Sequence, residues 1–453
     1  MSMLGILNIG TTALLASQRA LTTTSNNVAN ASTPGYTRQE VELSSLPSGL
    51  TSLTGSSGNG VTVSDITRLY DSFTTLQLRT EKSNSSYWDT YSNYASSVEN
   101  VFNETSDTGM SSAITDFFNA WQQVAQDPQS SVQRTALLTK AQYLSSRINS
   151  AYNDLAGQQT QIYQDSQQMV TQINNITKQI YDLNNKIVAS PGALDLQDQR
   201  DSLIEQLNQI TRVSTVEDGS GRYNVYLGGT PLVDASNSYN MAVTVDTNNA
   251  MQFTVGTNNF NVNSEMTSGQ LKANLDARDT TIQGYMNQLN TFATDFSNAI
   301  NTQQGLGFDL NGNGGTDFFS VPTAYAARDM HVAITDPNAI AASSTHAGVP
   351  GDNLNAQAIA NLANSTFMAG STPIDYYNSI VSTAGTDAQS ASTYSKFETS
   401  MVNQLETQRQ STSGVNLDEE AANLITFQKS YEAAAKMISI GSDLLDTIIG
   451  IVK

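Results

Sequence analysis

The residues best suited to chemistry lie in the segment from Asp309 to Gly314 (DLNGNG), which matches the opening of an EF-hand calcium loop. Such a loop needs a bidentate Glu at its twelfth position, and that position holds Ser320. The two histidines, His331 and His346, lack the H-E-x-x-H spacing of a zinc protease. We therefore predict a Gly/Asn turn at Asp309, surface positions for both histidines, and no metal or other cofactor.

Other catalytic signatures are also absent from the sequence. There is no cysteine, no G-x-S-x-G, no Walker motif and no dinucleotide-binding fingerprint. The 41 acidic and 21 basic residues give a formal charge of -20, which argues against a nucleic-acid backbone as the ligand. Only 14% of the residues are charged, so Ser, Thr, Asn and Gln supply most of the polarity. We predict a protein without catalytic residues and without a nucleic-acid partner.

Both chain ends bear on targeting. The first sixteen residues contain no Lys or Arg, so the basic region of a cleavable signal peptide is missing. The apolar run from Met437 to Val452 contains Asp443 and Asp446 and is shorter than the roughly 20 residues that a membrane helix needs. We expect no cleaved signal peptide and no membrane insertion.

The last segment, from Asn416 to Val452, has a coiled-coil pattern. Asn416 is the predicted N-cap, and the acidic residues that follow suit the positive end of the helix dipole. Because the apolar strip is too narrow to be stable alone in water, this helix needs a partner. The strip repeats every seven residues at Leu417, Leu424, Tyr431, Ile438, Leu445 and Val452, with a partial second row at Phe427, Ala434, Gly441 and Ile448.

A matching ladder lies at the other end of the chain, at Leu7, Leu14, Leu21 and Val28. A row of small or polar residues accompanies it, at Met3, Gly10, Ser17 and Thr24. The two ladders predict that the chain ends pair, whereas the simpler alternative is a terminal helix docked on its own domain. The remaining positions are mostly Ser, Thr, Asn, Gln and Ala, which suits contact with neighbouring subunits.

Between the ends, the pattern predicts helices, then strands, then helices again. Thr33-Pro34-Gly35 ends the first helix, and Ser190-Pro191-Gly192 turns a helical hairpin. Expected strands are 36–43, 61–66, 223–227, 241–245 and 251–255, and expected helices fill 70–212, 271–304, 356–363 and 376–410.

The predicted fold is thus mainly α with an inserted β domain, in a nested chain of several domains. Residues 1–45 and 414–453 form a terminal coiled-coil domain, and residues 46–212, 268–304 and 352–413 form a helical domain. Residues 213–267 form a small β domain, and 305–351 a loop-rich outer segment of unassigned fold.

Three groups of motifs carry a resemblance to a known family. Residues 25–39 (SNNVANASTPGYTRQ) and residues 413–424 (SGVNLDEEAANL) with 427–436 (FQKSYEAAAK) resemble the terminal signatures of the flagellar axial proteins of rod, hook and junction. The internal motifs at 268–271, 301–305, 307–312 and 317–319 look most like the first of the two hook-filament junction proteins. Gln304 stands where that family usually has His, Thr37 stands where Ser is common, and the chain is short for the family.

The resemblance implies an elongated structural protein exported to the flagellum without a cleaved signal peptide. Its terminal segments would be disordered in the monomer and form a coiled coil on assembly, in a ring that connects hook to filament. The implied partners are further copies of the chain, the hook protein, the second junction protein and an export chaperone on the C-terminal helix. The alternatives are another axial component or, less favoured, a flagellum-mounted hydrolase with its activity in 213–351.

The predicted site is therefore an assembly interface and not an active site. Its expected residues are those of the two ladders and of the Pro-Gly segment: Leu7, Leu14, Leu21, Val28, Asn30, Pro34, Gly35, Tyr36, Leu417, Leu424, Phe427, Tyr431, Ile438 and Leu445.

Overall fold

The computed structural model describes residues 3–47, 58–102 and 109–451. They divide into two compact units. The terminal unit comprises residues 1–83, 173–240 and 399–453, and the central unit comprises 84–172 and 241–398. The fold is mainly helical with small antiparallel sheets, which confirms the predicted class.

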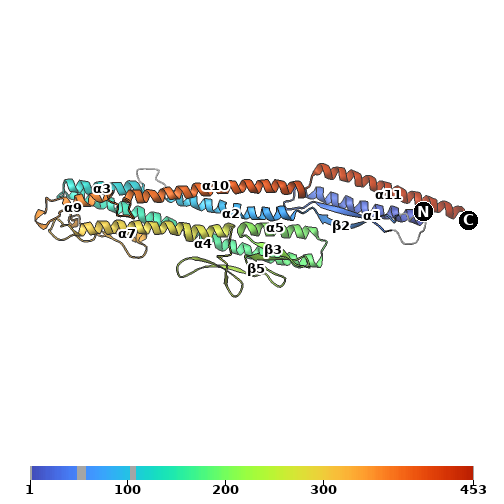
Figure 1. The fold of residues 1–453 in the computed structure, drawn as a ribbon, viewed down its shortest axis with the longest axis horizontal. Coiled ribbons are helices and arrows are strands. Elements are labelled where there is room, and N and C mark those ends of the chain that lie inside the picture. Colours follow the sequence, from blue (N-terminus) through green and yellow to red (C-terminus); the bar gives the residue numbers. More distant parts are fainter. Residues whose placement is uncertain (1–2, 48–57, 103–108, 452–453) are drawn as a thin grey trace. The chain divides into compact units, whose positions relative to one another are not determined.

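The terminal unit contains both ends of the chain (Figure 1). Its elements are α1 (Met3–Asn30), β1 (Gln39–Ser45), β2 (Val61–Arg68), the start of α2 (Ser72–Val101), the end of α4 (Ser131–Ala189), α5 (Leu194–Ile210), β3 (Ser214–Glu217), β4 (Tyr223–Leu227), β5 (Thr230–Val233), the end of α10 (Pro373–Ser413) and α11 (Leu417–Ile451).

Local sequence explains several boundaries in this unit. The Asn416 side chain accepts hydrogen bonds from the N–H groups of Asp418 (3.0 Å) and Glu419 (3.4 Å), as the predicted N-cap of α11 should. Asp71 caps α2 in the same way, through the N–H groups of Phe73 and Thr74. The turn at 190–193 separates α4 from α5, so the predicted helical hairpin is confirmed.

The central unit contains the rest of α2, α4 and α10 together with α3 (Met110–Gln126) and α7 (Gln283–Gly305). Its smaller elements are β6 (Met241–Val245), β7 (Met251–Val255), β8 (Phe260–Asn261), α6 (Gln270–Asp276), a π-helical turn (Ala277–Ile282), β9 (Phe319–Ser320), α8 (Ala326–Asp329), β10 (His331–Val332) and α9 (Leu354–Asn361). A cluster of fully buried aromatic rings forms its core: Phe117, Trp121, Phe296, Phe318 and Phe319.

The segment 305–351, which the sequence left unassigned, packs on this core. Arg134 is 1% exposed and donates hydrogen bonds to the carbonyl oxygens of Pro128, Pro337 and Ile340. Burial lowers the pKa of Arg134 to about 10. The guanidinium therefore holds the loops of this segment in place through their backbone.

The structure divides the predicted β domain 213–267 into two sheets in different units. The sheet β3–β4–β5 belongs to the terminal unit, where the Arg200 guanidinium lies 3.7 Å from the centre of the Tyr223 ring. The sheet β6–β7–β8 belongs to the central unit, where Arg278 and Asp279 of the π-helical turn bind the hairpin backbone at Asn249 and Met251. Each sheet is thus attached to its own helix.

The terminal unit is also larger than the expected 1–45 and 414–453. A network of ion pairs joins β2, α2 and α10 to α5 inside it, because buried carboxylates on α5 need cationic partners. The pairs are Arg68 with Asp198 and Asp201, Arg79 with Asp201, and Lys82 and Arg409 with Glu205.

Candidate functional site

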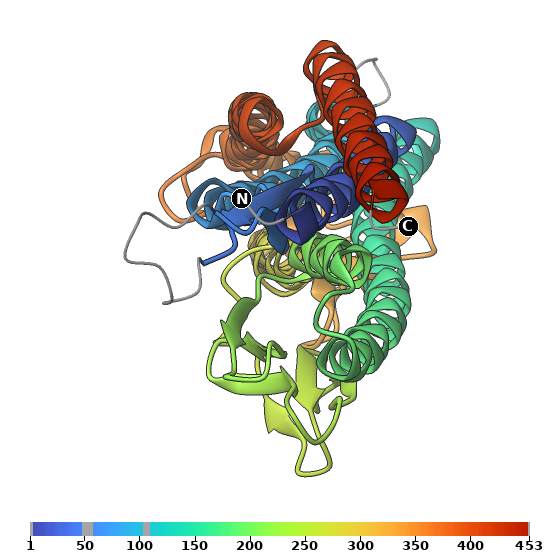
Figure 2. The same cartoon turned by 90° about the vertical axis from the view of Figure 1, so that its right-hand side faces the viewer.

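The helices α1 and α11, from opposite ends of the sequence, pack side by side in the terminal unit (Figure 1, and Figure 2 from the end). They run antiparallel, since Leu7 lies against Gly441 whereas Gly10 lies against Ile438 and Ala434. A Cβ added at Gly441 would lie 2.8 Å from Leu7 Cδ2, and one at Gly10 would lie 2.9 Å from Ile438 Cγ1. The two glycines thus permit a close approach of the helices.

On α11, the structure brings part of the predicted ladder onto α1. Leu424, Phe427, Ile438 and Leu445 are half-buried, and Ala434 and Gly441 of the second row are buried. Leu417 and Tyr431, in contrast, are 56% and 37% exposed.

The exposure of Leu417 follows from helix geometry. Since Leu7 lies against Gly441 and Gly10 against Ile438, Leu417 at the start of α11 lies opposite about position 31 of the antiparallel partner. Helix α1 ends at Asn30, so Leu417 lies at the edge of the pair.

On α1, the small companion row is the more buried one. Gly10, Ser17 and Thr24 are buried, whereas Leu7, Leu14 and Leu21 are half-buried and Val28 is 38% exposed. The reason is that α1 contacts both α11 and the β1–β2 hairpin, and small side chains fit between these neighbours. From the sequence, the leucine row was expected to form the contact and the row of small residues to accompany it.

At the start of α11, a buried polar cluster joins the two terminal signatures; we refer to Asn27, Tyr36, Arg38 and Glu420 as the terminal lock. Glu420 is 1% exposed and accepts hydrogen bonds from Arg38 Nε (2.7 Å) and Asn27 Nδ2 (3.2 Å). Asn27 Oδ1 accepts from Tyr36 Oη (2.8 Å) and from the N–H of Gln39 (3.0 Å). Every polar atom of Asn27 is therefore used.

The electrostatics of the terminal lock agree with this geometry. Burial, with Asp198 and Glu420 nearby, raises the pKa of Tyr36 to about 12, so its hydroxyl stays a donor. Burial alone would lower the pKa of Arg38, but its contacts with Glu420 and Glu419 raise it. Because Arg38 also lies 3.2 Å from Glu419, both acidic residues serve the same cation.

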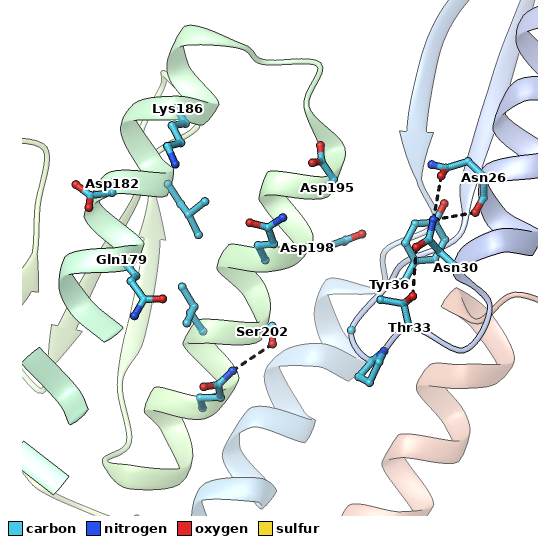
Figure 3. Close-up of a pocket in the computed structure, with 16 residues that line it drawn as sticks. Asn26, Asn30, Thr33, Tyr36, Gln179, Asp182, Lys186, Asp195, Asp198 and Ser202 are labelled. Carbon is cyan, nitrogen blue, oxygen red and sulfur yellow. Dashed lines mark hydrogen bonds between the residues drawn. The ribbon is translucent and has the colours of Figure 1, made fainter. Parts of the chain in front are cut away.

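The predicted residues Asn30, Pro34 and Gly35 lie in a loop beside the terminal lock. Pro34 and Gly35 are exposed, and Asn30 joins Asn26 to Thr33 through side-chain hydrogen bonds of 2.9 and 3.2 Å. The loop forms one wall of a groove of about 600 Å³, whose other wall comes from α4 and α5 (Figure 3). The loop is thus held in one shape and remains accessible.

Among the residues that the structure describes, much of the apolar surface of α11 is left uncovered. Large side chains exposed by 42 to 78% are Ile425, Ile440, Leu444, Ile448, Ile449 and Ile451. A helix with so much apolar surface in water needs a further contact.

Asn27, Arg38 and Glu420 are not among the site residues predicted from the sequence. All three lie in the quoted terminal motifs, and Arg38 is a lone cation near the first motif's end while Glu420 belongs to an acidic run in the second. That complementarity of charge between two distant motifs was the available signal.

The structure also places the residues considered for metal binding. Asp309 Oδ1 accepts from the N–H groups of Asn311 and Asn313, both at 2.8 Å, which makes a polar turn. His331 and His346 are exposed. In the described ranges, no three acidic or histidine side chains are grouped to hold a metal ion, and no helix is long and apolar enough to cross a membrane.

Three parts of the chain match family models. Residues 95–319 match the model described as "Flagellar hook-associated protein FlgK helical domain". Residues 7–37 match "Flagella basal body rod protein", and residues 410–451 match "Flagellar basal body rod FlgEFG protein C-terminal". The two end matches contain Asn27 and Glu420, which meet in the terminal lock.

Relatives that match over nearly the whole chain agree with these family models. The chain is 30% identical to flagellar hook-associated protein 1 of Escherichia coli, over 99% of this chain and 100% of that protein, and 28% identical to the Bacillus subtilis protein, over 96% of each. The E. coli alignment spans 551 positions, so that relative has segments without counterpart in these 453 residues. The solved flagellar hook junction protein FlgK from Burkholderia pseudomallei has a similar fold, with a TM-score of 0.68 at 20% identity, over 74% of this chain and 100% of that one.

Proposed function

The chain belongs to the family of flagellar hook-associated protein 1, a structural protein of the hook-filament junction, and from this premise we propose that it assembles there as a ring through α1 and α11. The observation that carries the proposal is the pairing of the two terminal helices, which leaves a long apolar surface on α11 uncovered. Neighbouring copies would supply the missing cover. The hook protein on one side and the second junction protein on the other complete the proposed set of axial partners.

The ring proposal is tested by placing charge in the seam between α1 and α11. The double substitution Leu424→Asp and Ile438→Asp should abolish filament growth. It would place two half-buried carboxylates between α11 and α1 without a cationic partner. Val216→Asp is the matched control, since this side chain is 56% exposed on β3 of the same unit. The proposal would be contradicted if cells with the double variant formed filaments as often as cells with the control.

We further propose that the terminal segments become ordered only on assembly. Hydrogen exchange of the purified monomer should then be fast through residues 1–40 and 415–453 and slow in the central helices, since a two-helix strip is marginal in water. Slow exchange at both ends would mean that the terminal unit is formed before assembly.

Export is the remaining part of the proposal. We propose that the chain leaves the cell without a cleaved signal peptide and that an export chaperone covers the apolar surface of α11 beforehand. Deleting the residues after Ser413 should eliminate chaperone binding, measured by titration calorimetry. Unchanged binding would refute the assignment of the chaperone site to α11.

A further inference from the structure

The first turns of α2 expose an apolar patch formed by Phe73 and Leu76. These side chains are 75% and 64% exposed, more than any other large apolar side chain that the structure describes in the terminal unit outside α11. They lie on the side of α2 away from α5, because Arg79 and Lys82 on the other side pair with carboxylates of α5. Two large apolar side chains together in water favour a contact with another molecule.

The groove between the Pro34 loop and the α4–α5 hairpin offers an apolar surface in the same unit; we refer to it as the hairpin groove (Figure 3). Leu183 and Leu203 line it from the hairpin, and Asp195 of α5 and Tyr36 of the loop belong to opposite walls. Its volume of about 600 Å³ is within the range of pockets that bury drug-sized molecules. One Phe and one Leu side chain therefore fit in it.

The patch and the hairpin groove lie at the same level of the terminal unit. Two ion pairs join α2 to α5 over 122 and 123 positions, so the two helices run parallel with that offset. Phe73 is therefore level with Asp195. Leu76, three residues further on, is level with Asp198. Both aspartates line the hairpin groove.

A closed ring restricts contacts between copies to groups at one level. Rotation about the ring axis leaves the height of every residue unchanged. With α2 and α5 along that axis, a side chain of one copy meets groups close to its own level in the next copy. Within its own chain, Phe73 lies on the side of α2 opposite the ion pairs with α5. The hairpin groove can therefore receive this side chain only from another copy.

We propose that Phe73 and Leu76 of one copy enter the hairpin groove of the next copy. This inference rests on the proposed ring and adds a contact outside the paired terminal helices. The two surfaces differ, so the contact is heterologous, which is the type that closes into rings. Gln77, exposed beside the patch, is level with Gln199 of the hairpin groove, and this pair marks the register.

Cysteine cross-linking between two single-cysteine chains tests this register, because the chain has no cysteine of its own. Tagged Gln77→Cys and untagged Gln199→Cys chains are produced together in cells that lack the native gene, and isolated hook-filament structures are oxidised. A bridge between the two chains joins two copies by design. Both positions are exposed, so neither substitution disturbs the fold, and Phe73 and Leu76 stay in place.

The control pair is Gln77→Cys with Gln209→Cys, because Gln209 is also exposed on α5 but lies about 15 Å further along the helix than Gln199. The proposal expects mixed dimers with Gln199→Cys and none with Gln209→Cys. It would be overturned by equal yields from the two pairs or by the absence of mixed dimers from both. Bridges from Gln199→Cys to another axial protein, in place of the mixed dimer, would also overturn it.

Charge placed in the patch separates this contact from the ring itself. Phe73→Asp should reduce the number of filaments about tenfold or more, because it brings a second carboxylate to the level of Asp195, and adding Asp195→Lys should restore them. Phe397→Asp, at an exposed aromatic position of the central unit, is the matched control and should leave the number unchanged.

Normal filament numbers with Phe73→Asp, or an equal loss with Phe397→Asp, would overturn the proposed contact. If the double substitution Leu424→Asp and Ile438→Asp still blocked growth in that case, the proposed function would stand and only the contact would fall.

Discussion

The aromatic core of the central unit and the α1–α11 pair of the terminal unit are both helix packings, but they bury very different side chains. The core contains Phe117, Trp121 and Phe296, each fully buried among other rings. The residues of α11 that are buried are Glu420, Ala434 and Gly441. An aromatic side chain removes 150–250 Å² from water, whereas Ala and Gly remove little.

The difference shows where each unit obtains its stability. The central unit buries a contiguous aromatic and aliphatic core of its own, so we expect this core to be stable without neighbouring copies. The terminal pair covers one narrow strip, adds a polar lock, and leaves its large apolar side chains exposed. On the proposed function, assembly with neighbouring copies would supply further stabilisation.

The largest expected effect is on the stability of the central unit. Phe296→Ala should lower the free energy of unfolding by about 3–5 kcal/mol, because it leaves a cavity among packed rings. Both tryptophans, Trp88 and Trp121, lie in the central unit, so urea unfolding followed by tryptophan fluorescence reports on it alone. Phe397→Ala, at a position that is 58% exposed, should change it by less than about 0.5 kcal/mol. Equal decreases in the free energy of unfolding of the two variants would contradict the expectation that the buried aromatic rings stabilise the central unit.

The next effect concerns the terminal lock. Glu420→Ala should destabilise the α1–α11 pair by about 3 kcal/mol, because it leaves Arg38 without its closest carboxylate and removes one of the two acceptors of the Asn27 amide group. Hydrogen exchange of α1 and α11 in assembled junctions measures this loss. Glu432→Ala, which removes an exposed pair with Lys429, is the matched control and should cost about 0.3 kcal/mol. A similar loss in the control would remove the special role of the terminal lock.

A smaller effect is expected where α1 and α11 approach each other most closely. Gly441→Leu should cost the helix pair about 2 kcal/mol, because its side chain would overlap Leu7. Gly450→Leu on the same helix has open space around it and serves as the control. The readout is again amide protection in assembled junctions, and unchanged protection in Gly441→Leu would show that the helices can separate freely.

The smallest effect is a dependence on acid in the network around α5. Burial alone would raise the pKa of Glu205, but Lys82 and Arg409 lower it below its usual value. A lowered pKa stabilises the fold above the unfolded-state pKa, and this contribution is lost as pH falls through the lower folded-state pKa. Below about pH 4.5, the urea midpoint of the terminal unit, followed by circular dichroism, should fall more for the native chain than for Glu205→Gln. Parallel decreases would contradict the assignment.

The sequence predicted what depends on local pattern. Asn416 begins α11 because its side chain caps the helix, and Ser190-Pro191-Gly192 ends α4 because that turn cannot continue a helix. The strands at β1 and β2, though not their pairing, and the mainly helical class were also predicted. These features arise from a few neighbouring residues.

What depends on distant partners was not predictable. A buried Glu420 looks like any acidic residue at a helix start until Asn27 and Arg38 are placed beside it. The burial of Ser17 and Thr24 depends on the hairpin that covers α1, and the exposure of Leu417 depends on where α1 ends. A prediction from hydrophobicity alone therefore ranks the burial of these residues in the wrong order.

The hydrogen bond between Asn27 and Glu420 joins residues 393 positions apart. At 5–20 residues per second, a ribosome needs about 20–80 s to make that length of chain. Throughout this interval the newly made α1 segment has no partner helix. Its leucine ladder at Leu7, Leu14 and Leu21 is therefore in water for at least this time, and the exposed polar residues Thr11, Gln18 and Thr22 on the same segment help to keep it soluble.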